Sequence, residues 1–229
     1  MQKQINNSIV ALEKIIGRFP VALLAGTVLE LLAMLYTPPQ WQPIFHGETF
    51  SKMSEAPWVL SSESWVQYRI LSPILGYLIF LRGNNFVWFM LLIAVGFLSL
   101  IYLLARKKNL QPLEAIGISA LMSFSTPLLF LLHFPGYTDL TTYIFILLLM
   151  MYHQKKTLCY LLFGVALFNH EIILFLVPWL VFLLNENKFA AKKYFLTLAV
   201  FILTALPYWL FRLYISSRVE IHYDLNFYF

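Results

Sequence analysis

The chain has 229 residues, of which 60% are hydrophobic and only 12% are charged, and its mean hydropathy is +0.74. Average soluble domains are about 45–50% apolar and about 25% charged, so this composition excludes a water-soluble globular protein. The same wealth of apolar residues excludes an intrinsically disordered chain. The formal net charge of +5 indicates basic cytoplasmic loops and contact with membrane lipid, with no nucleic acid as partner. We therefore expect an all-α integral membrane protein with a single transmembrane domain over residues 1–229.

The N-terminal region predicts two helices of different character. Residues 1–18 carry Ile5, Ile9, Leu12 and Ile16 at helical spacing beside three basic residues, which is typical of an interfacial helix. Residues 19–36 are almost wholly apolar and predict an uncleaved first membrane span.

A long first outer loop over residues 37–85 follows that span. Its last part, residues 70–81, is apolar but short and contains Pro73 and Gly76. We expect an interfacial helix in the outer leaflet there. The remaining apolar runs predict six further spans, which cover residues 86–105, 113–132, 140–152, 157–168, 172–184 and 194–215. An outer tail over 216–229 follows the last span.

The distribution of basic residues orients these seven spans. Lys and Arg concentrate in cytoplasmic loops, and a cytoplasmic N-terminus puts eleven of the 16 Lys and Arg residues on that side. A competing topology makes residues 70–81 a span and reverses the N-terminus. In the favoured topology most acids and histidines gather on the outer face, so we expect a functional site there.

The Asn169-His170-Glu171 turn is the sharpest chemical signal. Its flanking apolar runs are 12 and 13 residues long, well short of the ~20 that cross a bilayer, so the turn is expected to lie below the outer surface. Ionisable residues at such depth are candidates for function. The structural alternative is a helix cap, with Asn169 at the cap position and Glu171 in the first turn.

Four further residues of the outer face are candidates. Glu48 lies beside His46 in the outer loop, where a carboxylate can act as a general base or as a metal ligand. Asp139 opens a span after a Pro-Gly-Tyr-Thr turn, and Arg69 precedes a proline-bearing segment where it can hold a phosphate. The structural alternatives are a solvated loop acid, a helix cap and a snorkelling interface anchor.

This arrangement resembles the polytopic membrane glycosyltransferases of the C-type fold, which use lipid-phosphate sugars as donors. The resemblance is carried by His46-Gly47-Glu48 after the first span, by Arg69 before Pro73, and by Asn169-His170-Glu171. It covers residues from 19 to about 215. Members usually have an acidic pair in the first loop, whereas Glu48 has no adjacent acid, and they are usually longer; we therefore expect a short or truncated member.

The resemblance implies transfer of a sugar from a polyprenyl-phosphate donor at the outer face of a bacterial inner membrane. Glu48 and Asp139 are the implied catalytic residues. Arg69 would hold the phosphate, and His170, Glu171 and His46 would bind substrate. No cofactor is certain, and a divalent metal is the open possibility. The alternative function is a non-enzymatic transporter or flippase, or an assembly subunit for lipid-linked glycans, in which the intramembrane Glu30 would be central.

Overall fold

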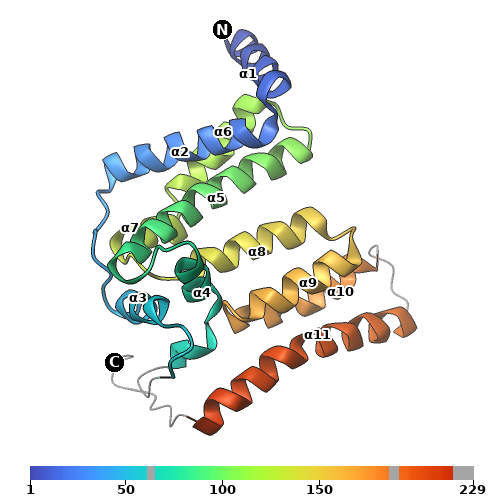
Figure 1. Cartoon of the computed structure of the whole chain (residues 1–229). Coiled ribbons are helices and arrows are strands. Elements are labelled where there is room, and N and C mark those ends of the chain that lie inside the picture. The colour runs from blue at the N-terminus through green and yellow to red at the C-terminus, as the bar shows by residue number, and fades with distance from the viewer. Residues whose placement is uncertain (61–64, 186–190, 219–229) are drawn as a thin grey trace. The chain divides into compact units, whose positions relative to one another are not determined.

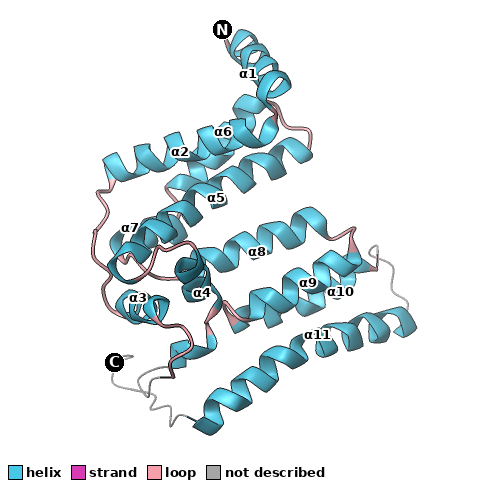
Figure 2. Ribbon diagram, viewed as in Figure 1, coloured by secondary structure: helices cyan, strands magenta, loops and turns pink. Residues whose placement is uncertain are grey.

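The computed structural model of the chain describes residues 1–60, 65–185 and 191–218 (Figure 1). Within these ranges every regular element is a helix (Figure 2), which confirms the all-α expectation. The expected tail over 216–229 lies outside the described residues from residue 219 onward. The chain divides into two compact units, one of Met1–Gly47 with Val87–Leu147 and one of Glu48–Phe86 with Leu148–Phe229.

In the first unit, α1, α2 and α6 pack against one another. A capping box between Gln111 and Glu114, with Pro112 at the first position, starts α6. The helices of this unit are α1 (Gln2–Ile16), α2 (Arg18–Tyr36), α5 (Phe86–Lys107, from Val87 onward), α6 (Pro112–Ser123), α7 (Thr126–His133) and the larger part of α8 (Asp139–Tyr152).

An ion pair fixes α1 to the end of α5. Arg106 donates from Nε and Nη2 to the two carboxylate oxygens of Glu13, at 2.9 and 2.6 Å, and the Tyr102 hydroxyl donates to the same carboxylate at 2.7 Å. The backbone N–H of Leu113 donates to Oδ1 of Asn6. The expected N-terminal helix is therefore present, and its polar side chains hold it to its own unit.

The run expected as one span over residues 113–132 is divided in two. The axes of α6 and α7 are bent by 49° at a short break. Ser125 precedes α7 with extended backbone and Pro127 lies in its first turn, so the chain restarts a helix here and does not continue the first one.

The second unit centres on α9 and α11, which lie side by side (Figure 1). The ring of Phe201 on α11 packs edge-on against Tyr160 and Phe163 of α9, at centroid distances of 4.9 and 4.8 Å. The elements of this unit are α3 (His46–Glu55, from Glu48 onward), η1 (Trp65–Tyr68), α4 (Leu71–Leu78), η2 (Gly83–Asn85), α9 (Lys156–Leu167), η3 (Glu171–Leu176), α10 (Val177–Leu184) and α11 (Ala191–Arg218).

Three helices among the described residues are long and apolar enough to cross a membrane. They are Arg18–Tyr36, Gly83–Lys107 and Ala191–Arg218, and the bent pair α6–α7 makes a fourth if it is one span. These helices match three of the predicted spans and support a membrane protein. α4 has 8 residues, about 12 Å of helix, and is too short to cross alone.

Candidate functional site

The turn between α9 and η3 is held by a buried hydrogen bond from a distant part of the unit. Asn169 is fully buried, and its Oδ1 accepts a 2.6 Å hydrogen bond from the hydroxyl of Ser72 on α4. The backbone N–H of Leu71 donates to the carbonyl of Phe168 at 3.0 Å. These bonds fix the segment after η1 beside the turn, which brings Arg69 close to Glu171.

The structural alternative in which Asn169 caps the following helix is wrong. His170 is the cap of η3, because its backbone is extended and its Nδ1 accepts from the N–H of Ile172 at 3.2 Å. Asn169 instead accepts the hydrogen bond from the Ser72 hydroxyl. Glu171 does occupy the first turn, where a negative charge is favourable.

Arg69, His170 and Glu171, all proposed from the sequence, come together in the structure. Nε of Arg69 and Nδ1 of His170 each lie 3.7 Å from Oε2 of Glu171. Both distances are longer than a hydrogen bond, and Oε2 is buried without a hydrogen bond among the described residues. The Arg69 side chain is 13% exposed and that of Glu171 is 34% exposed, so the pair lies at a partly open edge of the unit.

Arg212 completes the cluster and was missed by the sequence interpretation. Its guanidinium carbon lies 4.5 Å from the centroid of the Tyr68 ring, and Nη1 lies 3.4 Å from the Tyr208 hydroxyl. Tyr68 in turn shares a 2.8 Å hydrogen bond with Ser216. Tyr208, Arg212 and Ser216 are spaced by four residues on α11, so they follow one face of that helix.

Among the described residues, the cluster has two guanidinium groups and one carboxylate. The charges of Arg69 and Arg212 both act on Glu171, and Nε of Arg69 lies 3.7 Å from Oε2 of Glu171. Because arginine recognises carboxylate and phosphate oxygens in the same planar geometry, this cluster can bind an anion.

Glu48 and His46 lie on α3 but have different surroundings. Glu48 is exposed and pairs with Lys52 one turn later, at 2.8 Å. The His46 ring packs edge-on to Tyr137 at 5.8 Å. Gly47 and Gly136 make this approach possible, because a side chain on Gly136, at φ +98°, would lie 2.7 Å from the Gly47 carbonyl oxygen.

Asp139 is half-buried at the first residue of α8, in the same unit as His46 and Tyr137. Burial raises the pKa of the Tyr137 hydroxyl; a backbone hydrogen bond with His46 opposes this rise, and the charge of Asp139 adds to it. Tyr137 is thus a neutral hydroxyl beside two of the candidates. Glu48 belongs to the other unit.

The residues that the structure describes do not fit a metal centre. Among them, no three His, Cys, Asp or Glu side chains lie close enough together to hold an ion. Glu171 has two guanidinium groups near it, which is a setting for an anion and not for a cation.

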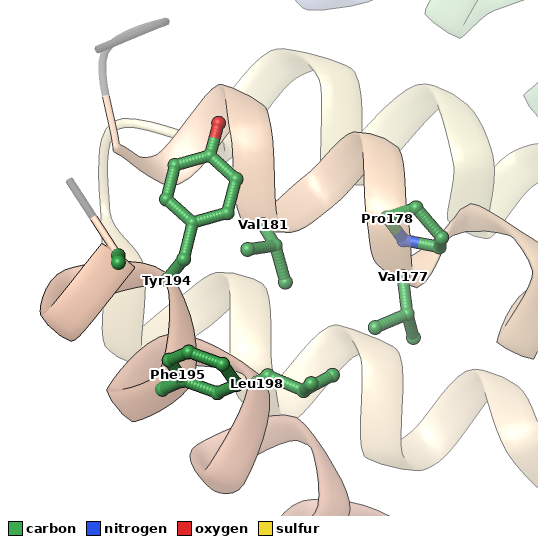
Figure 3. Close-up of a pocket in the computed structure, with 7 residues that line it drawn as sticks. Val177, Pro178, Val181, Tyr194, Phe195 and Leu198 are labelled. Carbon is green, nitrogen blue, oxygen red and sulfur yellow. The ribbon is translucent and has the colours of Figure 1, made fainter. Parts of the chain in front are cut away.

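An apolar pocket of about 340 Å³ lies between α10 and α11 in the second unit (Figure 3). Its lining is almost wholly hydrocarbon and suits a lipid chain better than a reacting polar group. The pocket is distant from Arg212, because Leu198 in its lining precedes Arg212 by fourteen residues, about 21 Å along the helix. The pocket is lined by Val177, Pro178, Val181, Ala191, Tyr194, Phe195 and Leu198.

No protein family, no curated protein and no solved structure matches this chain. The case for function therefore depends on the geometry of the chain itself.

Proposed function

We propose that this chain is an integral membrane glycosyltransferase that uses a polyprenyl-phosphate sugar, and that Arg69 and Arg212, which lie near Glu171, form the site for the donor phosphate. The observation that supports this most directly is that, among the described residues of the second unit, two guanidinium groups lie near a single carboxylate, with Nε of Arg69 at 3.7 Å from it and the charge of Arg212 also acting on it. The surplus charge suits a phosphate, and each guanidinium can donate two parallel hydrogen bonds to its oxygens.

The proposed reaction breaks one bond and forms one. The acceptor hydroxyl oxygen attacks the anomeric carbon, and the bond from that carbon to the phosphate oxygen breaks. The electron pair leaves with the lipid phosphate, whose growing negative charge the arginines stabilise. The acceptor proton passes to a carboxylate, and Glu48, which belongs to the same unit as the arginines, is the candidate for this role. His170 and Glu171 would bind the sugar or the acceptor.

The proposed topology has seven spans and a cytoplasmic N-terminus in a bacterial inner membrane. It adds α8, α9 and the η3–α10 segment, which are shorter apolar helices, to the four candidate spans. It places α4 and the Arg69 cluster at the outer face. Labelling of Lys52→Cys tests this, because the Lys52 side chain is 70% exposed and Cys159 is buried. Labelling from the outside is expected, and labelling only from the cytoplasm contradicts the topology.

Sugar transfer is tested with the purified chain in lipid nanodiscs and a radiolabelled polyprenyl-phosphate sugar. Arg69→Gln and Arg212→Gln should each lower transfer at least tenfold, because each removes a charged phosphate contact of about 1.5–3 kcal/mol. Arg82→Gln is the matched control, since Arg82 is an exposed arginine of the same unit that lies 5.2 Å from the Tyr77 ring. Equal rates in all three variants would overturn the assignment.

The candidate base is identified with the same assay. Glu48→Gln and Asp139→Asn both keep the shape of the side chain and remove its basicity. We expect transfer to be lost in Glu48→Gln and largely kept in Asp139→Asn, because Glu48 belongs to the same unit as the arginines. Full activity in both would contradict a base from either position. Binding of the donor without any transfer, in the wild type, would favour the flippase alternative.

A further inference from the structure

Glu30 lies in the C-terminal half of the membrane-spanning α2 and is not part of the Arg69 cluster. It is 2% exposed, and neither of its carboxylate oxygens has a hydrogen-bond partner among the described residues. An acid in such a position is rare, because burying it costs free energy that nothing local returns. The protonation state of the Glu30 carboxyl therefore has to be explained.

Glu30 belongs to the stripe of α2 that packs inside the first unit. The buried residues Ala22, Gly26, Glu30 and Ala33 recur at spacings of four, four and three. At Gly26 the backbones of α2 and α5 are nearly in contact, since a side-chain carbon there would lie 2.7 Å from the carbonyl oxygen of Val95. Small residues permit such close packing of spans, and this packing closes Glu30 off from solvent.

The charged groups on the helices around α2 are bonded to other residues or lie exposed at the surface of the first unit. Glu13, Tyr102 and Arg106 bond one another, and Tyr102 packs with Ala22, two turns or about 12 Å from Glu30. Glu114 closes the cap of α6. No described charged group stabilises a negative charge on Glu30. The remaining titratable groups on these elements are Lys3, Lys14, Arg18, Tyr36 and Lys107.

We propose that Glu30 is a proton-binding site within the membrane domain: its carboxyl takes a proton from water and holds it while α2 packs against α5. An isolated carboxylate in such surroundings would cost several kcal/mol or more, whereas the protonated acid is neutral. A proton also needs no cavity beside the side chain. The site is independent of the phosphate cluster, so a failure of either proposal leaves the other intact.

Infrared difference spectroscopy of the full chain in nanodiscs tests this directly. The spectrum of the wild type minus that of Glu30→Gln isolates the carboxyl of Glu30. We expect the C=O band of a protonated acid at pH 6 and its reversible loss as pH rises, with the protonated fraction falling about tenfold for each pH unit above the midpoint. Glu13→Gln is the matched control and should show only the bands of an ionised carboxylate.

Two infrared results would overturn the proposal. An ionised Glu30 at every pH would mean that a positive group compensates it, and a protonated band unchanged up to pH 10 would mean that no proton is exchanged.

If Glu30→Gln fails to fold, chemical modification of the wild type tests the proposal. Dicyclohexylcarbodiimide, which dissolves in membranes and modifies protonated carboxyls, should give an adduct at Glu30 and not at Glu13, in a yield that falls with pH. No adduct at any pH would contradict the proposal.

Discussion

Within residues 1–60, 65–185 and 191–218, two arginine–glutamate pairs join distant parts of the chain, and they are built differently. In the first unit Arg106 makes two short hydrogen bonds to Glu13, and Tyr102 supplies a third. In the second unit Arg69 stands 3.7 Å from Glu171, and Arg212 adds a second positive charge. The first pair satisfies its carboxylate within the fold. The second has more positive than negative charge, which is what an anionic ligand needs.

Removing the arginine of the first pair should have the largest effect on stability. Arg106→Ala leaves the Glu13 carboxylate, whose side chain is 5% exposed, without its main partner, and we expect a loss of about 3–5 kcal/mol in the free energy of unfolding. Arg18→Ala is the control, because Arg18 lies 3.8 Å from Glu13 with a side chain 59% exposed, and it should cost less than about 1 kcal/mol. Denaturant titration measures both. Equal losses would show that the pair does not hold α1.

The same pair predicts a dependence of stability on pH. The hydrogen bond from Arg106 holds the pKa of Glu13 below its ordinary value; burial opposes this, while the Tyr102 hydrogen bond and the charges of Arg106 and Arg18 add to it. A lowered pKa in the folded state contributes stability above the unfolded pKa of about 4.3, and this stability is lost as pH falls through the folded value. Thermal unfolding between pH 6 and pH 3 should therefore show a smaller acid effect in Glu13→Gln than in the wild type. An unchanged slope would contradict the account.

One substitution made in both pairs separates their roles. Glu171→Gln removes the negative charge of the second pair and leaves both arginines, so we expect polyprenyl-phosphate to bind roughly fivefold more tightly, equivalent to about 1 kcal/mol. Glu13→Gln should leave phosphate affinity unchanged. Equilibrium binding in nanodiscs measures both variants. Weaker binding in Glu171→Gln would mean that the carboxylate itself contacts the ligand or holds the arginines in place.

The smallest effect is expected at an ion pair that is not buried. Glu48 and Lys52 are one turn apart on α3, with side chains 57% and 70% exposed. Lys52→Gln should change the free energy of unfolding by less than about 0.5 kcal/mol, as measured by denaturant titration. A loss of 2 kcal/mol or more would show that this pair, too, holds the fold together.

The sequence predicted the long spans well because their signal is local. The runs over 19–36, 86–105 and 194–215 are predominantly apolar over about twenty residues, and the helices α2, α5 and α11 extend one to three residues beyond them. The run over 113–132 is equally apolar, but average hydropathy does not register a break at Ser125 and Pro127. The three shorter apolar helices are present, and whether they cross remains a prediction.

The site was predictable only in part, because its bonds are not local. Arg69, His170 and Glu171 were found from depth and charge. The hydrogen bond that holds Asn169 comes from Ser72, 97 positions earlier, and no pattern within a helix indicates such a pairing. A local pattern could have identified Arg212 but was not used. Arg212 lies near the end of an apolar span, with Tyr208 and Ser216 one turn to either side. Glu13 and Arg106, 93 positions apart, were likewise beyond prediction.

The most direct measurement is equilibrium binding of a polyprenyl phosphate to the full chain in nanodiscs, compared among the wild type, Arg69→Gln, Arg212→Gln and Arg82→Gln. The account predicts that the first two variants bind roughly tenfold to a hundredfold more weakly, that Arg82→Gln binds as the wild type does, and that all three unfold at similar denaturant concentrations. Wild-type affinity in Arg69→Gln and Arg212→Gln would contradict the phosphate site.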